Sequence, residues 1–179
     1  MDNLDRDYSP EAHEYAPFYS QYVEQTRGMS LMDALRMDVK KEDVLLEGLS
    51  DREADGSYAP GKWSIKEVLL HCVDAERVFA YRALRILRGD RTPLPGYAQD
   101  PYVAASGARY RTLESIRRER LSVRATTEIL FAEAPEEMLT NQLEADGQPV
   151  SARALVYIIP GHFLHHLGVL EVRYPPWAK

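Results

Sequence analysis

Apolar positions recur with the period of an α-helix in four long segments of the chain, residues 30–48, 64–88, 112–134 and 151–174. Each segment begins at a serine or threonine suited to cap a helix N-terminus, and the second carries a complete S-x-x-E capping box. Glycine or proline marks the end of each segment, at Gly48, Gly89, Pro135 and Pro175. The pattern predicts four amphipathic helices and offers no convincing pair of strands.

The connections before and after the third segment are both long. Residues 89–102 hold three prolines and two glycines, and residues 136–150 hold Asp146-Gly147, a turn signal typical of hairpins. Connections of this length indicate crossovers rather than a simple up-and-down arrangement. We therefore expect an all-α fold, a four-helix bundle with long crossover connections.

The composition is that of a folded globular protein. Apolar residues make up 45% of the 179 residues and charged residues 28%, close to the average for globular domains. This length predicts a single domain, residues 1–179. Its first part, residues 1–28, is polar and rich in tyrosine, and we expect it to form an N-terminal arm.

Acidic side chains outnumber basic ones. The 22 Lys and Arg against 28 Asp and Glu give a net charge of −6, which disfavours binding to nucleic acid. The arginines of the third segment are therefore expected on its solvated side: Arg117, Arg118, Arg120 and Arg124. Its apolar face is expected at Leu113, Ile116, Leu121, Ala125, Ile129 and Ala132.

The cysteine content and the N-terminus point to the cytoplasm. Cys72 is the one cysteine, so no disulfide forms within the chain, and a lone thiol fits a reducing compartment. The N-terminus is acidic and lacks the apolar core of a secretory signal. No apolar stretch approaches the roughly 18 residues that a membrane span needs, so we expect no membrane contact.

Two histidines share one stripe of the fourth segment. At about 100° per residue, a narrow seam forms from Leu155, Ile159, His162, His166, Val169 and Arg173. Imidazoles at i and i+4 on one helix face can ligate a single metal ion. The alternative is a pair of buried neutral histidines bonded to the backbone or to tyrosines. His165 lies about 80° from the seam centre and is expected outside the ligand set.

The second segment offers a third imidazole. His71 lies at the border between an apolar arc and a polar strip, which suits a ligand that faces a cleft between helices. Three histidines from two helices make a site with an open coordination position, the arrangement typical of catalytic metals. His71, His162 and His166 are therefore the predicted ligands. Pro160, two residues before His162, predicts a kink.

Two stretches of the sequence together resemble the DinB/YfiT-like superfamily. They are YAPGKWSIKEVLLHCVDAERVFAYRALRILRGDRTPLPGY and GHFLHHLGVLEVRY, and the W-S-x-x-E-V-L-x-H and G-H-x-x-H-H patterns are specific as a pair. The resemblance implies a four-helix bundle of unusual crossover topology, often dimeric, with zinc or nickel held by histidines that match His71, His162 and His166. Some relatives are transferases that depend on bacillithiol or mycothiol, and others are described as hydrolases.

A metal-dependent enzyme of the thiol S-transferase type is accordingly the leading functional hypothesis. A metal in an open site lowers the pKa of a bound low-molecular-weight thiol. With water in that position the same site predicts a metal-dependent hydrolase. The third hypothesis is a non-catalytic stress protein that binds a metal or ligand. The expected partners are a small-molecule substrate or thiol and, from the resemblance, a second copy of the chain.

Four charged residues of the second segment are candidates for the chemistry around the metal. Glu67 or Asp74 is the candidate general base of a hydrolase, with surface ion pairing as the alternative. Arg82 and Arg85 are candidates for holding the carboxylates of a thiol cofactor. Pairing with acidic residues at a dimer contact is the alternative for the two arginines.

Overall fold

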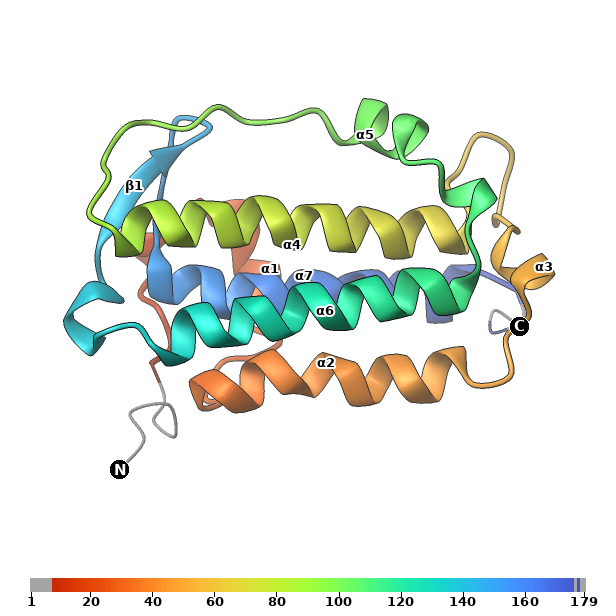
Figure 1. Ribbon diagram of the computed structural model, residues 1–179, viewed down its shortest axis with the longest axis horizontal. Helices are drawn as coiled ribbons and strands as arrows, with labels where there is room; N and C mark the ends of the chain where they lie inside the picture. Colours follow the sequence, from red (N-terminus) through yellow and green to blue (C-terminus); the bar gives the residue numbers. More distant parts are fainter. Residues whose placement is uncertain (1–7, 176, 178–179) are drawn as a thin grey trace.

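Four long helices form the body of the protein in the computed structural model, which describes residues 8–175 and 177 (Figure 1). They are α2 (Leu31–Leu46), α4 (Ile65–Leu87), α6 (Leu113–Ala132) and α7 (Ala152–Arg173). The predicted all-α four-helix bundle is confirmed. Residues 1–7 of the predicted arm and Pro176, one of the predicted stop residues, lie outside the described residues.

Each long helix begins at the predicted capping residue. A serine or threonine hydroxyl accepts a hydrogen bond from the backbone N–H three residues later, and Ser64 with Glu67 forms the full reciprocal box. The four caps are Ser30, Ser64, Thr112 and Ser151. Local sequence therefore fixes where the helix that carries His71 and the helix that carries His162 begin.

The helices close into a ring in which α7 contacts α2 and α4, and α6 contacts α4 and α2. The chain runs along α2 and α7 in one direction and along α4 and α6 in the other (Figure 1). Because α4 and α6 are parallel, residues 88–112 must return along the whole bundle, and they carry the short helix α5 (Gln99–Ala105) on the way. This segment is the predicted crossover.

The other long connection folds into a hairpin, which corrects the expectation that the chain has no strand pair. Strands β1 (Gln142–Ala145) and β2 (Gln148–Ser151) pair antiparallel at one end of the bundle (Figure 1). Asp146 (φ 54°) and Gly147 (φ 70°) make the tight turn between them. Leu94 of the crossover bonds to the hairpin, since its N–H donates to the Glu144 carbonyl at 2.9 Å. Strands of four residues are too short to show a period in the sequence.

The N-terminal segment packs along α7 through the short helix α1 (Ser20–Val23). The Tyr157 hydroxyl donates to the Met29 carbonyl at 3.0 Å and accepts from the Tyr8 N–H at 2.9 Å. The two backbones meet at Gly161, where a Cβ atom would lie 2.6 Å from the Tyr22 carbonyl carbon. Glycine is therefore required one residue before His162.

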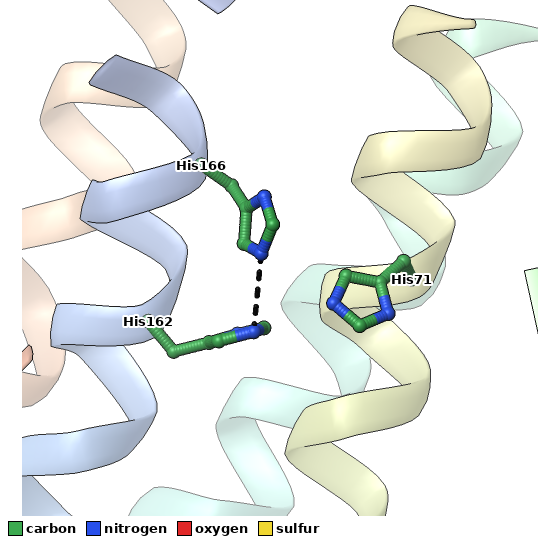
Figure 2. A group of neighbouring side chains, drawn as sticks. All are labelled: His71, His162 and His166. Carbon is green, nitrogen blue, oxygen red and sulfur yellow. Dashed lines mark hydrogen bonds between the residues drawn. The ribbon is translucent and has the colours of Figure 1, made fainter. Parts of the chain in front are cut away.

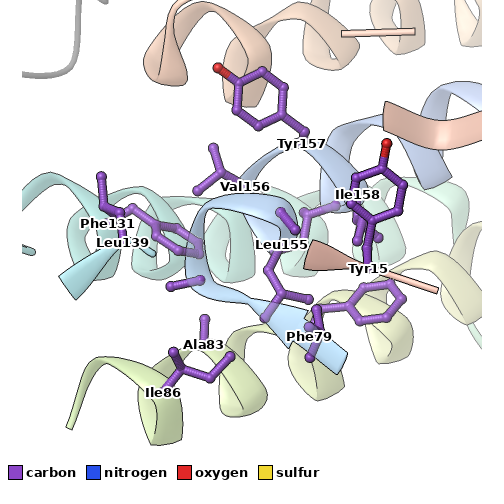
Figure 3. Packing of buried hydrophobic residues seen from close by; sticks show 14 of the residues in the cluster. Tyr15, Phe79, Ala83, Ile86, Phe131, Leu139, Leu155, Val156, Tyr157 and Ile158 are labelled. Atoms are coloured by element: carbon purple, nitrogen blue, oxygen red, sulfur yellow. The ribbon is translucent and has the colours of Figure 1, made fainter. Parts of the chain in front are cut away.

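Helix α7 is the central helix of the bundle. Four consecutive residues, Leu155 to Ile158, are fully buried, and Phe79 and Phe131 contribute to the same cluster (Figure 3). The helix continues through Pro160 without a break. It is long and apolar enough to cross a membrane by length and composition, which corrects the expectation that no apolar stretch approaches that length. However, 67% of its most apolar window is buried inside the protein. The bundle core thus accounts for its apolar character.

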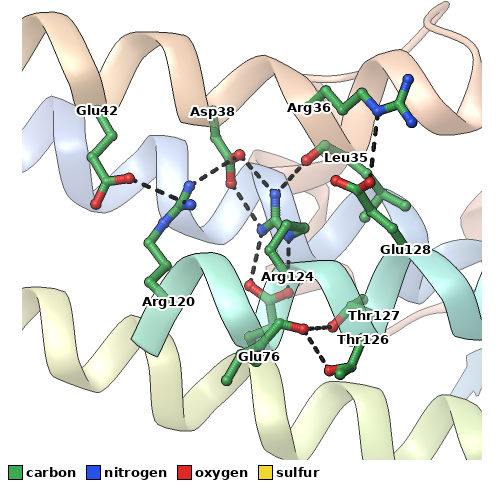
Figure 4. Close-up of polar contacts among 11 residues, drawn as sticks. Leu35, Arg36, Asp38, Glu42, Glu76, Arg120, Arg124, Thr126, Thr127 and Glu128 are labelled. Carbon is green, nitrogen blue, oxygen red and sulfur yellow. Dashed lines mark hydrogen bonds and ion pairs between the residues drawn. The ribbon is translucent and has the colours of Figure 1, made fainter. Parts of the chain in front are cut away.

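The arginines of α6 correct a second expectation. Arg120 and Arg124 are each only 2% exposed, whereas Ile129, expected on the apolar face, is 63% exposed. Buried carboxylates of neighbouring helices explain the inversion, because they offer the charges that a buried guanidinium needs. Arg124 binds Asp38 of α2 at 2.7 and 2.9 Å and Glu76 of α4 at 2.9 Å through two nitrogens (Figure 4).

The same network extends towards the histidines. Arg120 lies 3.1 Å from Asp38 and 3.4 Å from Glu42, and its guanidinium covers the Phe163 ring at 3.9 Å. Phe163 follows His162 in α7, and Glu76 lies five residues after His71 in α4. The buried ion pairs therefore tie α2, α4 and α6 together behind the face on which the histidines meet.

Candidate metal centre

Three histidines from two helices meet between α4 and α7. His71 comes from the middle of α4, while His162 and His166 lie one turn apart on α7, and all three rings face the space between the helices (Figure 2). One ligand atom from each ring lies within 4.8 Å of the other two. The structure thus brings together the three residues that the sequence pattern singled out.

The ring positions are close to those of a shared ligand set. The ring centroid of His71 lies 5.1 Å from that of His162 and 5.0 Å from that of His166. The Nε2 atoms of His162 and His166 are 3.2 Å apart. Nitrogens bound to one zinc at about 2.0–2.1 Å in a tetrahedron lie about 3.3 Å apart. A small inward movement of His71 would complete three corners of such a site.

Burial keeps these imidazoles neutral, which is the form that binds a metal. It lowers the pKa of His71 to about 4 and that of His166 to about 3. The pKa of His162, which is 5% exposed, is lowered well below its ordinary value by burial and by the neighbouring imidazoles.

The Nε2 atom of His71 is the observation that tests whether a metal fits. It is buried and has no hydrogen-bond partner among the described residues. An unsatisfied buried nitrogen is costly unless something binds it. Three neutral imidazole nitrogens suit zinc, nickel, copper or iron. The residues present therefore fit a divalent ion held by His71, His162 and His166.

Aromatic rings surround the three histidines. The Trp63 ring lies 5.0 Å from that of His71, and the Tyr22 ring packs edge-on against His162 at 5.3 Å and His165 at 5.4 Å. His165 is half-buried and lies outside the convergent group. Tyr22 belongs to the polar N-terminal segment, and nothing in the sequence beyond its aromatic character indicated that it lies at the site.

Two pockets reach the cluster from different sides. One, of about 110 Å³, is bordered by His162 together with residues of α1, α4, the crossover and the hairpin. The other, of about 510 Å³, is bordered by His166 together with Trp63, Asp100 and Tyr174. The histidines therefore separate a small pocket from a larger and more open one. We name them the His162 pocket and the His166 pocket.

The two candidate bases from the second segment have other contacts. Glu67 closes the N-terminal cap of α4, where its Oε2 accepts from the Ser64 N–H at 2.7 Å. Asp74 lies 3.6 Å from Arg77, and burial raises its pKa. Asp100 of α5 was not singled out in the sequence, because it lies in a proline-rich connection. It borders the His166 pocket and is the carboxylate that acts electrostatically on His71.

The candidate arginines also differ in their surroundings. Arg85 pairs with Asp90 and donates to the Tyr81 hydroxyl at 2.6 Å. Arg82 is 5% exposed and borders the His162 pocket. Cys72 follows His71 but is buried in an apolar cluster, and burial raises the pKa of its thiol well above the ordinary range.

The fold agrees with the comparison to known families. The family model of the DinB superfamily matches residues 40–170. The chain belongs to the DinB superfamily, which confirms the resemblance seen in its sequence. A search of curated protein sequences finds no match.

Two solved structures share the fold. One is YfiT from Bacillus subtilis, described as "a probable metal-dependent hydrolase with an unusual four-helix bundle topology", with a TM-score of 0.70 and 14% identity over 93% of each chain. The other is the mycothiol-dependent maleylpyruvate isomerase, with a TM-score of 0.64 and 15% identity. That alignment covers 84% of this chain and 63% of the isomerase. At these identities the likeness establishes the fold alone.

Proposed function

We propose that the protein is a metal-dependent enzyme of the thiol S-transferase type, with zinc or nickel held by His71, His162 and His166. One observation carries the proposal: three neutral imidazoles, two buried and one half-buried, converge where a small and a larger pocket reach them from different sides. A transfer between a thiol and a second substrate needs this arrangement, since each partner must reach the same centre.

The chemistry that a divalent ion supplies in such a site is Lewis acidity, which lowers the pKa of a thiol or water that joins it. The chain supplies the surroundings. Trp63 packs against the ring of His71 and Tyr22 against that of His162, so aromatic rings cover part of the site. Asp100 is the proposed acceptor of the proton that the nucleophile loses, because it borders the same pocket as His166. Glu67 and Asp74 are weaker candidates for this role.

An external thiol is favoured over a protein thiol. Cys72 is the one cysteine of the chain, and its burial and raised pKa make it a poor nucleophile. The His166 pocket, at about 510 Å³, lies within the range of about 300–1,000 Å³ typical of small-molecule sites. The mycothiol dependence of the isomerase with the same fold supports a thiol of this kind.

A metal-dependent hydrolase is the second candidate. It is supported by the description of YfiT and by a pocket in which water and Asp100 have access to His166. A non-catalytic stress protein is the third. We also propose a single domain, a cytoplasmic location and a homodimer. The homodimer is suggested by the family resemblance, whose members are often dimeric, and is compatible with the exposed Leu121 and Ile129 of α6.

Activity assays that separate transfer to a thiol from hydrolysis by water test the proposal. Zinc-loaded and chelator-treated protein would be mixed with an aryl halide and, in turn, bacillithiol, mycothiol, glutathione or cysteine, and separately with a panel of esters and amides. We expect thiol consumption that needs both the metal and the aryl halide and is lost in His166→Ala. Metal-dependent cleavage of an ester or amide without a thiol would contradict the transferase proposal and support the hydrolase. A bound metal with no turnover in either assay would contradict both and support the non-catalytic stress protein.

A further inference from the structure

The His162 pocket has a wall of aromatic rings. Tyr19, Tyr22, Phe79 and Tyr97 border it, and the tip of the hairpin closes its outer side. Its volume of about 110 Å³ is near that of cavities that hold a single benzene ring, at about 150 Å³. It is far below the range of about 300–1,000 Å³ that takes larger ligands. The pocket therefore suits a small, flat molecule and excludes a cofactor of the size of mycothiol.

Arg82 places one positive charge on this wall. Although it is 5% exposed, no carboxylate among the described residues lies within ion-pair distance of its guanidinium. Its guanidinium acts on the Tyr19 hydroxyl, where burial raises the pKa and Arg82 offsets part of that rise, and it lies 5.9 Å from the centroid of the Phe79 ring. Asp146 borders the same pocket from the exposed hairpin turn and acts electrostatically on Tyr19, but it forms no ion pair with Arg82.

The other buried arginines show how unusual this is. Arg120 and Arg124 face Asp38, Glu42 and Glu76, so each buried guanidinium has at least one carboxylate. A buried cation without a counter-charge is costly, and a guanidinium matches a carboxylate through two parallel hydrogen bonds. Arg82 thus lacks the partner that the rest of the protein supplies to its buried arginines.

We propose that the His162 pocket binds a small, flat organic carboxylate, whose charge pairs with Arg82 while its body lies among the aromatic rings. The opposite end of such a molecule would face His162. The proposal names the class of the second substrate and rests on the proposed transferase for the reaction, whereas the carboxylate binding itself needs no metal.

Benzoate and benzamide are matched probes, because they share a ring and differ in charge. Their binding would be measured by calorimetry on wild-type protein, Arg82→Gln and Arg85→Gln, each with and without zinc. Arg85 is the control: it lies one turn further along α4 but is held by Asp90. Nuclear Overhauser contacts from the ring protons of benzoate to Tyr22 and Phe79 would locate the ligand.

We expect benzoate to bind wild-type protein and Arg85→Gln at least about ten-fold more tightly than Arg82→Gln, with or without zinc, as for the loss of a charged hydrogen bond. Benzamide should bind weakly and equally to all three. The proposal would be overturned if Arg82→Gln bound benzoate as tightly as wild-type protein does, or if benzoate binding needed zinc but not Arg82.

If Arg82→Gln does not fold, the benzoate–benzamide difference and the contacts to Tyr22 and Phe79 in wild-type protein decide instead. The metal-free arm separates the two proposals. If benzoate binds but no thiol turnover is found, the carboxylate pocket is supported and the transferase is rejected. If thiol turnover is found but benzoate binding does not depend on Arg82, the transferase is supported and the carboxylate pocket is rejected.

Discussion

Burial shifts the pKa values of individual side chains in opposite directions in this protein. It lowers the pKa of His71 to about 4, so the imidazole stays neutral, and it raises the pKa of Glu42 to about 7. Glu42 is the third carboxylate in a network with two arginines, Arg120 and Arg124. A protonated Glu42 balances the buried charge, since two cations then face two anions.

The raised pKa of Glu42 predicts a pH-dependent stability. The folded protein holds this proton up to about pH 7, whereas the unfolded chain releases it near 4.5, so the contribution of Glu42 to stability falls as pH rises between these values. Glu42→Gln mimics the protonated acid at every pH. In urea unfolding we expect it to match wild type near pH 4 and to be more stable by up to about 3 kcal/mol near pH 8.

Glu47→Gln, at the exposed end of α2, is the control for the Glu42 experiment and should follow the wild-type curve. A Glu42→Gln variant that is less stable than wild type near pH 8 would show that Glu42 is ionised and needed as a partner of Arg120.

At the scale of elements, the sequence predicted the long helices but not the small ones. Serine or threonine caps and helical periods mark α2, α4, α6 and α7, and the structure has them within a few residues. The turn of the hairpin was recognised at Asp146-Gly147, but its strands and α5 were missed, because strands of four residues and a helix that contains Pro101 carry no periodic signal. The prediction of which face of α6 is buried was wrong, because the burial of Arg120 and Arg124 depends on carboxylates of other helices.

The contact between α1 and α7 predicts a large effect of a small substitution. In Gly161→Ala the new methyl group meets the Tyr22 backbone, which cannot rotate away as a side chain can. We expect a loss of about 1–3 kcal/mol in urea unfolding, together with a displaced Tyr22 ring. Gly168→Ala, seven residues further along α7, meets nothing within 4 Å and should gain up to about 1 kcal/mol. Similar effects of the two substitutions would contradict the close approach.

Across the whole molecule, the ion pairs hold three helices at fixed distances behind the histidines. The sequence located His71, His162 and His166 by their helix faces, because a helical projection needs only local information. It did not find Asp100, the two pockets or the different surroundings of Arg82 and Arg85. Those features arise where the crossover and the hairpin reach α4, which no local pattern encodes.

The buried ion-pair network predicts that two arginines of α6 contribute unequally to stability. Arg124→Met leaves Asp38 and Glu76 buried without their bidentate partner, so we expect a loss of about 3–5 kcal/mol of unfolding free energy. Arg118→Met changes an exposed position of α6 and should stay within about 0.5 kcal/mol of wild type. Chemical denaturation of the two variants under the same conditions makes the comparison. Equal losses would mean that Arg124 is solvated.

Calorimetric titration of the metal-free protein with zinc tests the central claim most directly. Wild type and His165→Ala should each bind one ion per chain with similar affinity, because His165 lies outside the convergent group. His71→Ala, His162→Ala and His166→Ala should each weaken binding at least about ten-fold, with circular dichroism used to verify that each variant is folded. Unchanged affinity in the three ligand variants, or an equal loss in His165→Ala, would contradict a metal centre formed by these three histidines.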